Sequence, residues 1–145
     1  MVTNSESIVG RFSVEVELNN DEDLVRAKLG LILPEQIRRM KIDGVVDSGA
    51  ARLVIPESVV RELGLQISDR VKVRYADGRT GERSVAERVR LTYGGRSGIF
   101  AAIVEPARDS ALIGAIVLED LDFVVDCRVQ KLVPRDPNMI ISEIE

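Results

Sequence analysis

Short segments in which apolar and polar residues alternate, separated by turn residues, run along most of this 145-residue chain. In residues 12–18 every second residue is apolar, the pattern of a half-buried strand. Further strands are predicted over residues 37–46, 53–55, 71–75, 85–93, 99–104, 122–125 and 129–133. Only short helices fit between them, after residues 19–23, between Pro56 and Gly64, and over residues 115–121. Many short strands at regular spacing predict an all-β, barrel-like domain.

The length and composition indicate one domain over residues 1–145, with a core at about residues 11–134 and a C-terminal arm at residues 135–145. Only three Phe, two Tyr and no Trp are present, so we expect an aliphatic core. The arm follows the last predicted strand, and in an oligomer it offers strands that pair with another copy of the chain. Asp77-Gly78 joins two predicted strands and favours a type I′ hairpin turn.

The charges argue against a nucleic-acid partner. The formal net charge is −4, whereas binding to a phosphate backbone needs a concentrated basic face. The arginines are interleaved with Asp and Glu, which favours a solvated surface of mixed charge. The residues in question are Arg38, Arg39, Arg74, Arg79, Arg83, Arg88 and Arg90.

The sequence gives no indication of a targeting signal or of cysteine chemistry. The first seven residues lack the features of a secretory signal, and no stretch approaches membrane-spanning length. We therefore expect a cytoplasmic protein with no membrane partner. Cys127 is the only cysteine, which excludes an intrachain disulfide and a cysteine-cluster zinc site. We expect it to be a structural, half-buried residue at the end of a strand.

The segment Val45-Val46-Asp47-Ser48-Gly49-Ala50 is the strongest candidate site. Two β-branched residues lead into a turn that presents one carboxylate beside a small hydroxyl group and a glycine. Since the chain contains no histidine, acid–base chemistry has to rest on carboxylates. A polar turn between two strands would use the same residue types, so the motif alone is weak evidence.

Two other segments strengthen the interpretation of this turn. About sixty residues later, Leu112-Ile113-Gly114 leads into a predicted helix. Between the two lies a long predicted hairpin whose tip contains Tyr75, Ala76, Asp77 and Gly78, and this hairpin could act as a lid. Tyr75 could line a pocket or simply pack across the hairpin.

With these motifs, the chain resembles the retropepsin-like aspartic proteases, the group of the retroviral proteases and their bacterial relatives. The turn with Asp47, Ser48, Gly49 and Ala50 is similar to their catalytic motif, and Leu112-Ile113-Gly114 is similar to their second motif. The resemblance implies an acid-protease β-barrel with one or two short helices, which is half of a C2 dimer. It also implies that residues 75–78 belong to a substrate-binding flap. The segment at residues 19–37 is longer than in compact viral members.

The resemblance implies an aspartic endopeptidase in which two Asp47 carboxylates, one from each subunit, activate a water molecule. Two carboxylates that share a proton can act as base and acid without histidine. The partners are then a peptide or protein substrate and a second copy of the chain, with no cofactor and no metal. The Ser48 hydroxyl group would link the two turns, and Gly49 would let substrate backbone approach.

Other interpretations stay open at this point. The same scaffold could be a non-catalytic dimeric β domain that binds extended peptides or a partner protein, or a regulatory part of a larger complex. Other carboxylates are poorer candidates. Asp43-Gly44 is typical of a hairpin or bulge, Asp109-Ser110-Ala111 lacks the glycine, and Asp126 is expected to end a strand.

Overall fold

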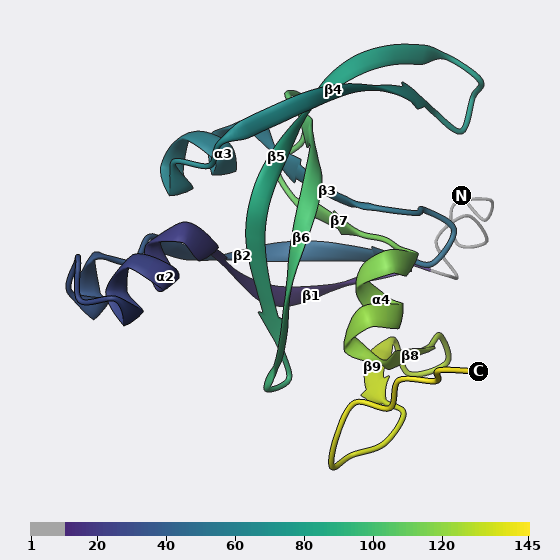
Figure 1. Cartoon of the computed structure of the whole chain (residues 1–145). Helices are drawn as coiled ribbons and strands as arrows, with labels where there is room; N and C mark the ends of the chain where they lie inside the picture. The colour runs from purple at the N-terminus through teal and green to yellow at the C-terminus, as the bar shows by residue number, and fades with distance from the viewer. Residues whose placement is uncertain (1–10) are drawn as a thin grey trace.

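The computed structural model describes residues 11–145, and these form a β-barrel with short helices around it (Figure 1). The strands are β1 (Arg11–Asn20), β2 (Arg39–Asp47), β3 (Leu53–Pro56), β4 (Ile67–Arg74), β5 (Thr80–Tyr93), β6 (Arg96–Glu105), β7 (Ala111–Ile113), β8 (Phe123–Asp126) and β9 (Lys131–Pro134). The helices are α2 (Asp21–Lys28), the 3₁₀ turn η1 (Pro34–Gln36), α3 (Glu57–Leu63) and α4 (Ala115–Leu121). Within residues 11–145 no helix is long and apolar enough to cross a membrane.

Six strands close into a ring. The large sheet has the order β1-β2-β7-β3-β6-β5-β4, and β1 also pairs with β5, which closes the barrel and leaves β4 outside it. The pairs β2–β7 and β3–β6 are parallel, and the other pairs in this sheet are antiparallel. The predicted all-β barrel is confirmed. Three short α-helices accompany it in the described residues, where the family resemblance implied one or two.

The centre of the barrel is aliphatic, as the composition predicted. The largest fully buried side chains are those of Leu18, Leu53, Ile55, Leu63, Leu91, Ile113 and Leu121. They come from strands on all sides of the barrel and from the helices α3 and α4. Burial of a leucine or isoleucine side chain stabilises a fold by about 1.5–3 kcal/mol each, so this cluster supplies much of the driving force for closure.

The strand β4 and the first half of β5 form a hairpin that extends away from the barrel, at the top of Figure 1. The Gly78 amide donates to the carbonyl oxygen of Tyr75 over 2.9 Å, and Gly78 alone in this turn has a positive φ, of 89°. The prediction of a type I′ turn at Asp77-Gly78 is therefore wrong. The loop is one residue longer, and glycine takes the left-handed position at its end.

Two further predictions about single residues are wrong. Asp43-Gly44 does not mark a hairpin or a bulge, because both residues lie inside β2 and its pairing with β1 runs through them without a shift. A Cβ atom on Gly44 would lie 2.5 Å from Ile113 Cδ1, so the glycine makes room for a core side chain. Cys127 is exposed rather than half-buried, because it follows the end of β8 in a turn. Asp126 does end β8, as expected.

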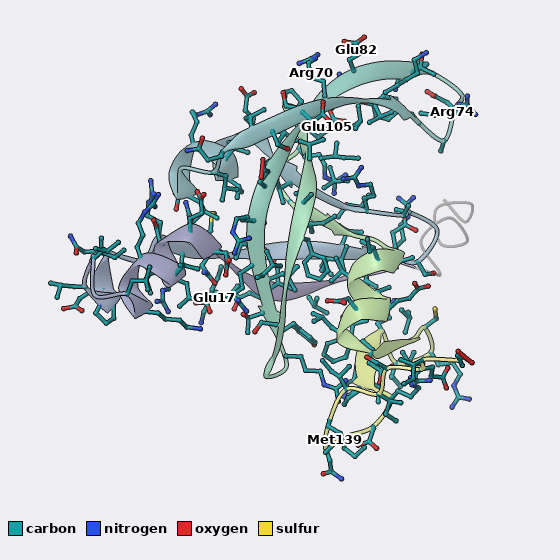
Figure 2. All side chains as sticks on the ribbon, in the orientation of Figure 1. Glu17, Arg70, Arg74, Glu82, Glu105 and Met139 are labelled. Atoms are coloured by element: carbon teal, nitrogen blue, oxygen red, sulfur yellow. The ribbon has the colours of Figure 1, made fainter. Side chains whose placement is uncertain are left out.

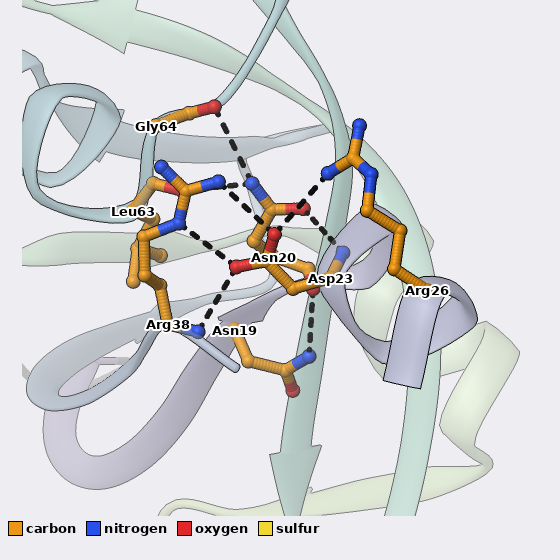
Figure 3. A network of polar contacts seen from close by, with 7 residues as sticks. All are labelled: Asn19, Asn20, Asp23, Arg26, Arg38, Leu63 and Gly64. Atoms are coloured by element: carbon orange, nitrogen blue, oxygen red, sulfur yellow. Dashed lines mark hydrogen bonds and ion pairs between the residues drawn. The ribbon is translucent and has the colours of Figure 1, made fainter. Parts of the chain in front are cut away.

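The segment at residues 19–37 is attached to the barrel by a buried polar network, shown in Figure 3. Asp23 is 3% exposed and accepts hydrogen bonds from Arg38 Nε over 2.8 Å and from the Arg38 amide over 3.0 Å. Asn20 caps α2 by accepting from the Asp23 amide, and its Nδ2 donates to the carbonyl oxygen of Leu63 over 2.8 Å. These contacts join the first turn of α2 to the end of α3.

The C-terminal arm contacts its own subunit and forms no strand within residues 135–145. Asp122, 8% exposed, accepts from Arg135 Nε over 2.8 Å and from the Ile141 amide over 3.0 Å. The arm is thereby tied to the end of α4. Pairing of the arm between subunits stays a prediction.

Candidate active site

The turn after β2 fixes Asp47 by main-chain contacts. The Gly49 amide donates to Asp47 Oδ1 over 3.0 Å, and the Ala50 amide donates to the Asp47 carbonyl oxygen over 3.1 Å. The Asp47 side chain is 17% exposed, and its Oδ2 lies 3.0 Å from Nη2 of Arg11. Ser48 is exposed beside it. An aspartate that bonds the amide two residues later stabilises this kind of turn, so the carboxylate has a defined orientation at the mouth of the barrel.

The second motif lies directly beside the first. In the parallel pairing of β7 with β2, Leu112 is opposite Val45 and Ile113 is opposite Val46. Ile113 is 1% exposed, so it belongs to the core beneath the turn, whereas Leu112 is only partly buried. The structure thus brings together two motifs that are far apart in the sequence.

Helix α4 braces the loop that follows the turn. The amides of Ala115 and Ile116, at the start of α4, donate to the main-chain oxygens of Ala50 over 2.8 Å and Ala51 over 2.9 Å. A Cβ atom on Gly114 would lie 2.5 Å from the main-chain oxygen of Arg52. The glycine is therefore needed because the backbone of the turn approaches the helix too closely for any side chain.

A cleft of about 750 Å³ lies between the turn and the hairpin. Its lining includes four of the predicted site residues, namely Gly49, Ala50, Tyr75 and Leu112. The other lining residues are Ala51, Arg52, Val54, Val71, Lys72, Val73, Arg74, Arg79, Arg83, Ile103, Glu105, Ala107 and Arg108. Asp47 and Ser48 are not part of the lining, but they directly precede Gly49, which is. Ala76, Asp77 and Gly78 form the exposed tip of the hairpin outside the lining, and Ile113 and Gly114 are buried behind it.

Tyr75 connects the hairpin to the barrel. Its hydroxyl group lies 2.7 Å from Glu105 Oε2, and Arg83 Nε donates to Glu105 Oε1 over 2.8 Å. The hydrogen bond to Glu105 raises the pKa of Tyr75 above its ordinary value. The guanidinium groups of Arg79 and Arg83 lie 5.3 and 5.8 Å from the centre of the Tyr75 ring. Figure 2 shows Glu105 beneath the hairpin, on the side that faces the barrel.

Sequence reasoning did not find Arg52, Arg83, Glu105 and Arg108 as cleft residues. Arg52 could have been found, because it lies five residues after Asp47 in the same loop. The other three carry no local signal, since only the pairing of β3, β5, β6 and β7 brings them to the cleft. Within residues 11–145 no group of three or more potential ligands could hold a metal ion.

The comparisons with known proteins agree with this architecture. A family model described as "gag-polyprotein putative aspartyl protease" matches residues 34–120, which include both motifs and the hairpin. The comparison with curated proteins found no match.

Among solved structures, the EIAV protease complexed with the inhibitor HBY-793 is 15% identical, with a TM-score of 0.53, over 77% of this chain and 88% of that chain. The simian foamy virus (mac) protease is 16% identical, with a TM-score of 0.47, over 74% of this chain and 91% of that chain. At this identity, the likeness to the EIAV protease concerns the fold.

Proposed function

The chain belongs to the gag-polyprotein aspartyl protease family, and we propose that it is an aspartic endopeptidase that is active as a C2 homodimer. The observation that carries this proposal is the Asp47 turn. It holds one carboxylate, oriented by the Gly49 amide, beside a cleft that a hairpin covers. An extended peptide fits such a cleft, and a carboxylate is the group that activates water where no histidine is available.

One turn is half of an active site. Hydrolysis by this chemistry needs one carboxylate that accepts a proton from water and a second carboxyl group that donates a proton to the peptide carbonyl oxygen. A chain with one such turn obtains the second carboxylate from another copy, and a two-fold axis makes both copies equivalent. The two Asp47 carboxyl groups would then share one proton, so that one acts as the base and the other as the acid.

Three neighbours of Asp47 have proposed roles in this dimer. The exposed Ser48 hydroxyl group would bond across the two-fold axis, and Gly49 would let the substrate backbone approach the carboxylates. A shared proton requires one neutral carboxyl group, so a positive charge close to both oxygens would oppose it. Arg11, whose side chain is 52% exposed, would therefore move aside from at least one Asp47.

We propose that the hairpin at residues 71–89 is a lid that closes over the peptide. Its tip at Ala76, Asp77 and Gly78 is exposed, and outside its pairing with β5 the strand β4 pairs with no other strand. Segments with few tertiary contacts open at low free-energy cost, which suits a lid. Hydrogen exchange measures the mobility of the hairpin. If its amides exchange as slowly as those of β2 and a peptide inhibitor does not change their rate, the hairpin is not a lid.

Peptide cleavage by a matched pair of variants tests the proposed function. Asp47→Asn keeps the size of the side chain and removes the ionisable group, so cleavage of a diverse peptide library should vanish while the fold persists. Asp43→Asn makes the same change at an exposed position of the same strand and should leave cleavage intact. Cleavage that survives in carefully purified Asp47→Asn would refute the mechanism.

Sedimentation across a range of concentrations tests the dimer. We expect an apparent molecular weight above the 16.0 kDa of one chain, and we expect it to rise with protein concentration. Activity should follow the dimer fraction. Full activity at concentrations where sedimentation detects only the monomer would contradict an active site shared between two copies.

A further inference from the structure

The walls of the cleft are basic, although the chain as a whole is acidic. Among the lining residues within 11–145, six carry a positive charge and only Glu105 carries a negative one, whereas the formal net charge of the whole chain is −4. A cleft lined by one sign of charge focuses its field on whatever enters it. The excess of positive charge is therefore a property of the site rather than of the surface in general.

Most of the carboxylates near the cleft already have partners. Both oxygens of Glu105 are engaged, one by Arg83 and one by the Tyr75 hydroxyl group. Asp77 pairs with Arg79 over 2.7 Å. These contacts cancel the charges of Arg83 and Arg79 in part, and they leave no free carboxylate among the described residues that line the cleft.

Within residues 11–145, four of the six basic lining residues form no ion pair, namely Arg52, Lys72, Arg74 and Arg108. Arg108 donates to the Ser110 carbonyl oxygen over 2.9 Å and to Ser110 Oγ over 3.1 Å, so neutral acceptors hold its guanidinium group. Arg52 forms no ion pair with any of the residues 11–145 that the structure describes. Both are partly buried, and they lie in the two loops that follow the Asp47 turn and β6.

The other two unpaired basic residues, Lys72 and Arg74, lie on β4 and are exposed. Lys72 and Arg74 alternate with Val71 and Val73 along β4, so they share a face with Arg70. Arg70 pairs with Glu82 over 3.5 Å, and Figure 2 shows this pair on the outer side. Lys72 and Arg74 also line the cleft, but because they are exposed, solvent and salt screen their charges more than those of the partly buried Arg52 and Arg108.

Apolar side chains line the same cleft as these two arginines. Val54 on β3 is opposite Leu112 on β7, and Ile103 on β6 is beside Val54. All three line the cleft and are partly buried. An aliphatic surface with charged donors close by is suited to a ligand that has apolar carbons next to a carboxylate.

We propose that this protease selects peptides that carry a glutamate or aspartate, next to an aliphatic residue, in the stretch bound by Arg52 and Arg108. The proposal rests on the proposed function, because it names the substrate class of the same cleft. A single-stranded nucleic acid is a poorer occupant. Its bases need open aromatic faces, and the one aromatic ring that the described part of the chain contributes to the lining, that of Tyr75, has Arg79 and Arg83 close to it.

Paired peptides test the proposal. Each pair has the same sequence with Glu or Gln at one position, and the full-length chain is assayed for kcat/KM on both. We expect the Glu peptide to be preferred about fivefold at low salt, as one or two partly exposed ion pairs would give, and the preference to shrink at high salt. Arg52→Gln should remove most of the preference, and Arg52→Lys should restore part of it. Arg128→Gln, at an exposed position outside the cleft, should leave it unchanged.

Binding measurements separate this proposal from the proposed function. Fluorescein-labelled Glu and Gln peptides are titrated with Asp47→Asn, with and without Arg52→Gln. If no peptide is cleaved but the Glu peptide binds selectively through Arg52, the acidic preference stands and the protease assignment fails. Cleavage of both peptides at equal rates in the wild-type protein overturns the acidic preference alone. Tighter binding of an oligothymidine than of the Glu peptide also overturns it.

Discussion

Replacement of Gly114 by alanine should damage the active site without touching a catalytic group. The added Cβ atom would lie 2.5 Å from the Arg52 carbonyl oxygen, 2.7 Å from the Arg52 amide nitrogen and 2.8 Å from the Ala50 carbonyl oxygen. All three neighbours are backbone atoms, so no side chain can rotate away. The loop has to shift by several tenths of an ångström, which strains the hydrogen bonds from Ala115 and Ile116 to this loop.

The expected cost is about 2–3 kcal/mol of unfolding free energy, the upper part of the range of about 1–3 kcal/mol for an extra methyl group in a packed site, because only backbone atoms can move. Equilibrium urea unfolding measures it, at one protein concentration because a dimer makes stability concentration-dependent. Peptide cleavage should fall more than the folded fraction does, since Ala50 and Arg52 line the cleft. Gly81→Ala is the control, because its Cβ atom would meet only the end of the Arg83 side chain, at 3.3 Å. Stability within 0.5 kcal/mol of the wild type in Gly114→Ala would refute the reasoning.

Three further predictions concern the supports of the fold and the site. Asp23→Asn should lower the free energy of unfolding by about 2 kcal/mol at neutral pH. Because Arg38 lowers the pKa of Asp23, the wild type should lose the stabilisation from this ion pair as the pH falls below about 4. Urea unfolding at pH 3–7 should show this pH-dependent loss in the wild type and not in the variant. Tyr75→Phe, which removes the contact with Glu105, should speed hydrogen exchange at the hairpin, and an unchanged rate would show that the contact does not hold it. Ser48→Ala should weaken the dimer in sedimentation before it abolishes cleavage, whereas Ser48→Thr, which keeps the hydroxyl group, should retain both.

Local sequence predicted the elements well where neighbouring residues decide the outcome. The alternation at residues 12–18 corresponds to β1, and Pro56 and Gly64 flank α3 as expected. The end of β2 at Asp47 was also predicted correctly, since two β-branched residues and a glycine-containing turn determine it. In each case the deciding residues lie within a few positions of one another.

Charged residues were harder to interpret, because their partners are distant in the sequence. The acidic residues near position 21 were expected to form the first turn of a helix, and they do. Their burial was not predicted. Asp21 is 1% exposed because Arg88 and Arg90 on β5 bind its carboxylate, and Asp23 is buried against Arg38. Arg38 and Arg88 are exposed and Arg90 is partly buried, so the burial of their carboxylate partners is what the expected mixed-charge surface left out.

The same distinction explains why the Asp47 turn was visible in the sequence and the charge of the cleft was not. The geometry of the turn depends on hydrogen bonds that the amides of Gly49 and Ala50 donate to Asp47, so a short motif encodes it. The charge of the cleft depends on which carboxylates are already engaged, and Glu105 is engaged by residues more than twenty positions away. A chain that keeps the turn can therefore change the charge of its cleft by single substitutions at positions such as Arg52 and Arg108. Substrate selectivity in this protein should accordingly be easier to alter than its chemistry.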